Sequence, residues 1–153
     1  TLFWGWLRIH PVLHLPVEAI ALPLALGGLK SRWKLSCSFY LASLLGTAIT
    51  DVTMALTGVM SFWPEVVVAT PSEAPYLLNE AAKLVLQPGS LIILLTAAGF
   101  ILWLAKKFWT QSTLPSKHQE AWRVAAAVLS TTLFIDALFL VLSLSIPSLS
   151  GLI

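Results

Sequence analysis

Long apolar stretches with almost no charge constrain this chain more than any other feature. Four of them are long enough to cross a hydrocarbon core of about 30 Å, which takes about 20 helical residues. They cover approximately residues 11–29, 35–63, 90–109 and 121–146. Only 10% of the residues are charged, whereas soluble domains carry charge at about 25% of positions. The sequence therefore predicts an all-α integral membrane protein with four transmembrane helices, forming one domain over residues 1–153.

The same composition excludes several classes of function. Four spans in so short a chain leave little room for an extramembrane catalytic domain, and there is no phosphate-binding glycine loop and no HExxH motif. We therefore expect no enzymatic activity. The net charge of +2 is too small to indicate a nucleic-acid partner, and the single cysteine, Cys37, excludes an internal disulfide.

Basic residues give the expected orientation in the membrane. Seven of the nine Lys and Arg residues fall in the loop after the first stretch or around the loop after the third: Lys30, Arg32, Lys34, Lys106, Lys107, Lys117 and Arg123. With four spans, both loops lie on the same side. The positive-inside rule assigns that side to the cytoplasm or to the stroma of a plastid. The opposite side receives both termini and the connection over residues 64–89.

This connection is predicted to contain an amphipathic helix over residues 72–87. Its polar side chains fall within about 100° of arc: Asn79, Glu80, Lys83 and Gln87. Ser72 is the expected N-cap, and Pro75 fits the first helical turn because its missing N–H is not needed there. We expect this helix to lie on the membrane surface. Its apolar face can alternatively dock on a partner or cover a bound lipid or pigment.

Three of the apolar stretches each contain one acidic residue: Glu18, Asp51 and Asp136. A carboxyl group inside a bilayer costs at least a few kcal/mol, so it marks a functional or assembly site that faces protein. At about 1.5 Å per residue, the three lie within roughly 8 Å of one another in depth. Thr47 and Thr132 precede the two aspartates by four residues and share their helical faces. Hydrogen-bonded packing, a proton or cation path, and contact with a bound cofactor all remain open for these acids.

Residues 42–51 and 127–136 share a weak similarity, matching at Ala, Leu, Thr and Asp. The second and fourth stretches run in the same direction in a four-span topology. The similarity is therefore compatible with a duplicated helical hairpin.

The first apolar stretch opens with two histidines close to Glu18. His14 and Glu18 are four residues apart on one helical face, and His10 lies one turn earlier, although Pro11 and Pro16 can bend the path. Imidazole can ligate the magnesium of a chlorophyll, and with a carboxylate it can hold a transition metal. Interface placement with ordinary hydrogen bonds is the alternative interpretation.

Three motifs carry a resemblance to a known family. They are His10-Pro-Val-Leu-His14-Leu-Pro-Val-Glu18, Gly46-Thr-Ala-Ile-Thr-Asp51, and residues 121–136 with the sequence AWRVAAAVLSTTLFID. Together they resemble a family of uncharacterised multi-pass membrane proteins of cyanobacteria and photosynthetic plastids. The resemblance covers roughly residues 8–142 and implies the thylakoid membrane as the location.

In that setting, the resemblance implies an accessory subunit that stabilises a photosystem core or bridges it to antenna subunits, with photosystem I of a red-lineage alga as the first candidate. Chlorophyll is the implied cofactor, with carotenoid as a further pigment, and membrane lipid surrounds the helices. The implied cofactor-binding residues are His10, His14, Glu18, Asp51 and Asp136, with no separate metal site. The chain begins at Thr1 rather than Met, which leaves a cleaved targeting peptide and a trimmed sequence both open; a removed transit peptide would suit the implied setting.

Two other hypotheses compete with this one. In the first, Glu18, Asp51 and Asp136 form a buried acidic site in a small proton- or cation-handling membrane protein or an assembly factor. In the second, the chain is a scaffold subunit without a cofactor, stabilised by helix packing alone.

Overall fold

The computed structural model of the chain describes residues 11–145, with side chains from Leu15 onward. These residues form helices and connecting turns and no strand. Three helices are long and apolar enough to cross a membrane: α4 (Lys34–Leu56), α7 (Pro88–Thr113) and α8 (Gln119–Ser145). The all-helical prediction is confirmed, and three of the four predicted spans are present as single long helices.

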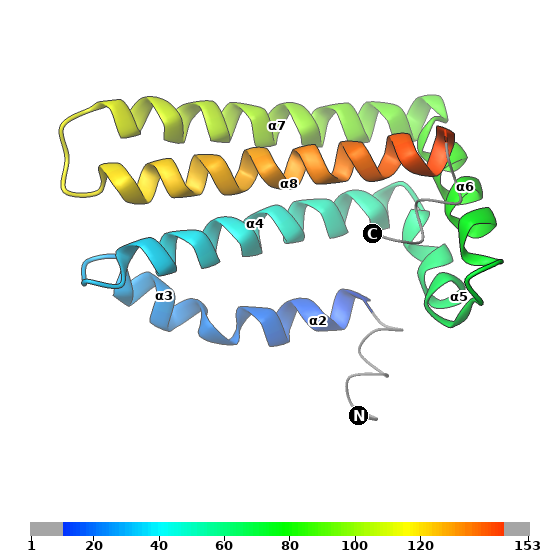
Figure 1. Ribbon diagram of the computed structural model, residues 1–153, viewed down its shortest axis with the longest axis horizontal. Coiled ribbons are helices and arrows are strands. Elements are labelled where there is room, and N and C mark those ends of the chain that lie inside the picture. The colour runs from blue at the N-terminus through cyan, green and yellow to red at the C-terminus, as the bar shows by residue number, and fades with distance from the viewer. Residues whose placement is uncertain (1–10, 146–153) are drawn as a thin grey trace.

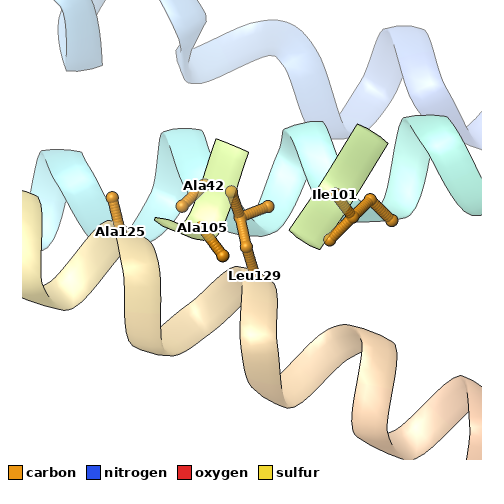
Figure 2. Packing of buried hydrophobic residues seen from close by; sticks show 5 residues of the cluster. All are labelled: Ala42, Ile101, Ala105, Ala125 and Leu129. Carbon is orange, nitrogen blue, oxygen red and sulfur yellow. The ribbon is translucent and has the colours of Figure 1, made fainter. Parts of the chain in front are cut away.

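Helix α8 is the centre of the bundle. It packs along both α7 and α4, whereas α4 and α7 touch each other much less (Figure 1). Helices α7 and α8 form an antiparallel hairpin, and α4 runs parallel to α8, as predicted. The buried core is made mostly of small side chains on these three helices (Figure 2): Ala42, Ile101, Ala105, Ala125 and Leu129.

Small residues at four-residue intervals let α4 approach α8 closely. Ser38, Ala42 and Gly46 are all buried on one face of α4. A Cβ atom added at Gly46 would lie 3.0 Å from Thr132 Oγ1. Eight residues earlier, Ser38 Oγ donates a hydrogen bond of 2.6 Å to the carbonyl oxygen of Ala121. Membrane helices pack in this way because lipid is as apolar as a leucine side chain, so close van der Waals contact has to hold them together.

The first predicted span, residues 11–29, is helical but interrupted. It consists of α2 (Pro11–Glu18), the 3-10 turn η1 (Ala19–Ala21) and α3 (Leu22–Gly28). Because Pro23 has no N–H for the carbonyl of Ala19, the N–H of Leu22 donates to that carbonyl instead and tightens the turn. The segment lies beside α4 (Figure 1).

The second predicted span, residues 35–63, extends too far at its C-terminal end. Helix α4 ends at Leu56, and Gly58 follows with a φ of 76°. Glycine adopts this left-handed conformation without a steric penalty and often ends a helix. The chain then turns through η2 (Val59–Phe62) into the short helix α5 (Trp63–Val68).

The third and fourth predicted spans, residues 90–109 and 121–146, correspond to α7 and α8. Helix α7 extends beyond its predicted bounds at both ends. Its start is fixed by Pro88, which occupies the first helical position, where a missing N–H is harmless.

The predicted amphipathic helix over residues 72–87 is α6 (Ala74–Val85). It crosses one end of the bundle and packs against α8 and η2 (Figure 1). Its apolar face is buried against them through Leu78, Ala81 and Ala82. The helix therefore covers the end of the bundle, and its apolar side faces protein.

The predicted N-cap, Ser72, is wrong. The turn before α6 is fixed by Thr70, whose backbone N–H and hydroxyl both donate to the carboxylate of Glu73, at 3.1 Å and 2.8 Å. These two bonds hold the pKa of Glu73 below its ordinary value. The sequence Thr-Pro-Ser-Glu over residues 70–73 has the spacing of a capping box, which is the signal that identifies Thr70.

The two basic loops lie at the same end of the bundle, as predicted (Figure 1). Lys34 Nζ donates a hydrogen bond of 2.6 Å to the carbonyl oxygen of Lys117 and so joins the start of α4 to the loop before α8. Helices α5 and α6 and the turn between them, which carry Glu65, Glu80 and Glu73, lie at the opposite end. The charge asymmetry read from the sequence is thus an asymmetry between the two ends of the molecule.

Replacing Gly46 by leucine is expected to destabilise the protein by about 1–3 kcal/mol, because the new side chain pushes Thr132 and α8 away from α4. Gly99→Leu is the matched control, since a Cβ there meets nothing within 4 Å. The free energy of unfolding of both variants is measured by titration with dodecyl sulfate in mixed micelles. Equal stability of Gly46→Leu and the wild type would contradict the close α4–α8 packing.

Candidate functional site

A cavity of about 300 Å³ lies among α4, α6, α7 and α8, towards the end of the bundle that α6 covers. Helix α7 contributes only apolar side chains to it, and so does α6. The polar side chains come from α4, the residue after it, and α8: Thr50, Thr53, Thr57, Asp136 and Ser143. The cavity is therefore an apolar chamber with polar groups along two of its walls.

Asp136 is held by a residue of a different helix. Thr50 Oγ1 on α4 donates a hydrogen bond of 2.8 Å to Asp136 Oδ2. Thr132, which shares the helical face of Asp136, instead donates to the carbonyl of Val128 in its own helix, at 3.1 Å. Asp136 thus takes part in a hydrogen bond between two helices, which is the contact expected for hydrogen-bonded packing.

The parallel register of α4 and α8 places a second polar pair at the other end of the cavity. Thr57 and Ser143 each lie seven residues beyond the Thr50–Asp136 pair, and both are buried. Thr57 Oγ1 donates to the carbonyl of Thr53 at 2.8 Å. Ser143 is only 1% exposed, and its Oγ has no hydrogen-bond partner among the described residues. A buried hydroxyl in that state costs about 1–3 kcal/mol.

The backbone of Ser143 does have a partner, Asn79. Asn79 Nδ2 on α6 donates a hydrogen bond of 2.7 Å to the Ser143 carbonyl oxygen. The sequence placed Asn79 among the polar side chains of the amphipathic helix and did not predict this contact with α8. In an α-helix, a backbone carbonyl accepts a hydrogen bond from the N–H of the residue four positions later. For Ser143 that residue is Pro147, which has no N–H. Pro147 is the sequence signal that could have identified Asn79 as a donor to α8.

Asp51 and Glu18 lie away from this cavity. Asp51 is half-buried and follows Tyr40 by eleven residues, which places both on one face of α4 within about 20°. Tyr40 contacts α2, where its hydroxyl donates to the carbonyl oxygen of Glu18. Glu18 itself is exposed. Neither Asp51 nor Glu18 lines the cavity at Asp136.

The predicted ligand set at the start of the first stretch is only partly visible. His10 lies outside the described residues, and so does the side chain of His14. Within the described part of the chain, no group of three His, Cys, Asp or Glu residues could hold a metal ion. The three acids therefore do not converge on one site there.

The outer face of α7 carries an aromatic pair. Phe100 and Trp103 are about half exposed, and their rings stack with centroids 5.9 Å apart. Lys107 Nζ lies 5.0 Å from the centroid of the Trp103 ring, a distance at which a cation is attracted to the aromatic face. This face combines an apolar surface with the ammonium group of Lys107.

The family model described as "Protein of unknown function (DUF3120)" matches residues 1–144. The chain belongs to this DUF3120 family. The match covers α4, α6, α7 and nearly all of α8, so Thr50, Asp136 and Ser143 all fall within the DUF3120 region. No curated protein and no solved structure matches this DUF3120 chain.

A double-mutant cycle with Thr50→Val and Asp136→Leu is expected to give a coupling energy of about 0.6–1.7 kcal/mol, the range for hydrogen bonds between membrane helices. The measurement is unfolding by dodecyl sulfate. Thr96→Val is the control for Thr50, because Thr96 is exposed and donates only to the carbonyl of Ile92 in its own helix. Strict additivity of the Thr50 and Asp136 variants would rule out their contact.

Proposed function

We propose that this chain is an accessory, pigment-binding subunit of a photosynthetic membrane complex, with photosystem I as the first candidate. The observation that carries the proposal is its outer surface. Large apolar side chains are exposed on all three long helices, including Phe39, Leu95 and Phe134. A chain with this surface acts by contact inside the bilayer, with lipid, pigment or neighbouring subunits. The photosynthetic setting is supported by the resemblance of its motifs to proteins of cyanobacteria and plastids.

The proposal includes a fourth span made of α2, η1 and α3. These elements cover residues 11–28 and run beside α4 (Figure 1). At about 1.5 Å per α-helical residue and 2.0 Å per 3-10 residue, they extend over roughly 28 Å, close to the thickness of a hydrocarbon core. Four spans put both basic loops on one side of the membrane, which is the stroma in this setting.

The pigment site that we propose is on the outside of the bundle. A chlorophyll ring has the flat apolar face that stacks on aromatic side chains, and the Phe100–Trp103 pair offers such a surface on α7. Glu18 lies on α2, which packs beside α4 and is separated from α7 by α4 and α8 (Figure 1), so it is a ligand candidate for a second, separate pigment. His10 and His14 remain ligand candidates from the sequence.

A proton- or cation-handling function is the second candidate, and it rests on the carboxyl group of Asp136 in the wall of the cavity. The lining argues against it, because the cavity is almost entirely apolar and the described acids do not gather there. An ion path needs polar groups or water along its length. Loss of proton flux on Asp136→Asn, with pigment content unchanged, would favour this function over the first.

Purification of the tagged protein in mild detergent tests the proposal. We expect chlorophyll absorption bands and core polypeptides of a photosystem in the same fraction. Trp103→Leu should lower the ratio of chlorophyll to protein by about threefold, the effect of losing one aromatic stacking contact. Trp109→Leu is the matched control, because Trp109 is similarly exposed on the same helix. A colourless protein that purifies alone would refute the proposal.

A further inference from the structure

Among the residues that the structure describes, Asp136 is the only titratable one that lines the cavity. Its carboxyl group is part-buried, and Oδ2 accepts the hydrogen bond from Thr50. Oδ1 accepts no hydrogen bond from the described residues, and it is not one of their fully buried, unpartnered atoms. Because Asp136 lines the cavity, this second oxygen is accessible to a ligand there.

The cavity contains no positive charge to match this carboxyl group within the described part of the chain. Seven of the eight Lys and Arg residues in residues 11–145 belong to the two basic loops and the helix ends beside them. The eighth, Lys83 on α6, pairs with Glu80 at 2.7 Å, and its side chain is 60% exposed. A carboxylate in apolar surroundings is stable only when a cation or a proton neutralises it. A positively charged ligand therefore complements the cavity.

Aromatic side chains lie close to this carboxyl group. Phe139 follows Asp136 by three residues on α8, so the two side chains are neighbours on the surface of that helix. Phe62 lines the same cavity from η2. The face of an aromatic ring attracts a cation, and quaternary ammonium groups are typically recognised in this way.

The rest of the lining selects the kind of cation. A metal ion needs several oxygen ligands, and a primary ammonium ion has three N–H donors to satisfy. The cavity is almost entirely apolar and offers few polar groups for either of them. A quaternary ammonium ion has no N–H donor, and its charge is covered by apolar groups. Such an ion fits both the single carboxyl group and the apolar wall.

The size of the cavity restricts the body of the ligand. At about 30 Å³ per water-sized group, 300 Å³ holds about ten non-hydrogen atoms. A benzyltrimethylammonium ion has about this size.

A second hollow offers an entrance from the bilayer. It has a volume of about 550 Å³, is lined by α4 and α7, and shares Ile49, Thr53 and Ala97 with the cavity. Its lining includes the exposed side chains of Val52 and Ile92, so it opens towards the surroundings of the bundle. A ligand with an apolar body reaches the cavity from lipid along this path.

We propose that the cavity binds a lipophilic quaternary ammonium ion, with the charged centre at Asp136 and the apolar body against the rest of the lining. Such a ligand carries its own apolar surface, so it does not need the polar path that an inorganic ion requires. The inference concerns binding alone and is independent of a pigment on the outer face of α7.

Binding of benzyltrimethylammonium to the purified full chain in dodecyl maltoside tests the inference, because this detergent has no charged headgroup. Isothermal titration calorimetry measures the Kd, with protein-free micelles as the blank. We expect saturable binding at a single class of site. Neopentylbenzene, which has carbon in place of the nitrogen and so the same shape without the charge, should not displace the ion.

Asp136→Asn is the decisive variant, because it removes the negative charge and keeps an acceptor for Thr50. We expect it to raise the Kd at least about tenfold, the effect of losing a charge pair in a partly desolvated site. Asp51→Asn is the matched control. Asp51 directly follows Thr50 and so lies at a similar depth, but it does not line the cavity.

Two further variants test the position of the ligand. Phe139→Leu should raise the Kd about threefold through the lost attraction to the ring, whereas Phe134→Leu, at an exposed position of the same helix, should not. Ala98→Leu fills the cavity from α7 and should abolish binding. Gly99→Leu is its control, because a Cβ there meets nothing within 4 Å.

Two outcomes would overturn the inference. One is an unchanged Kd in Asp136→Asn. The other is displacement of the ion by neopentylbenzene at equal affinity, which would make the cavity a general site for apolar molecules. Chlorophyll content measured on the same preparations separates either result from the fate of the pigment proposal.

Discussion

The close parallel packing of α4 on α8 is the constraint on which the rest of the structure depends. Gly46 has no side chain where Thr132 lies, and this contact fixes the distance between the two helices. It also fixes their register, which brings Thr50 to Asp136 one turn later. Because α8 is shared between α4 and α7, those two helices touch each other little, and the cavity lies among α4, α6, α7 and α8.

The distribution of side-chain size follows from the bilayer as solvent. Inside the bundle the buried residues are mostly alanine, serine and glycine, while large apolar side chains such as Leu24, Ile92 and Phe134 are exposed. Lipid solvates these large side chains well, so nothing drives them inward, and small residues allow the backbones to approach. A bundle built from small residues also leaves internal space wherever its helices diverge. At one end α6 closes that space, and the hydrogen bond from Asn79 attaches α6 to the end of α8.

Much of the fold was predictable because hydropathy and charge act within single segments. The long helices, the amphipathic helix and the common end of the two basic loops were predicted correctly. The interruption before Pro23 and the end of α4 at Gly58 depend on one backbone group each, which a hydropathy average hides. The site was harder to predict than the fold. The hydrogen-bond partner of Asp136 is 86 residues away in the sequence and is set by the register between two helices. Spacing within one helix pointed to Thr132, and only the packing selects Thr50.

The measurement that tests this account most directly is disulfide cross-linking between α4 and α8 in intact membranes, on a Cys37→Ala background. Cysteine pairs at Ser38 with Ala121 and at Thr50 with Asp136 are expected to cross-link, because both positions are in contact in the parallel register. A mismatched pair at Ser38 with Asp136 is expected to stay reduced. Cross-linking of the mismatched pair, or failure of both matched pairs, would contradict the packing from which the cavity is derived.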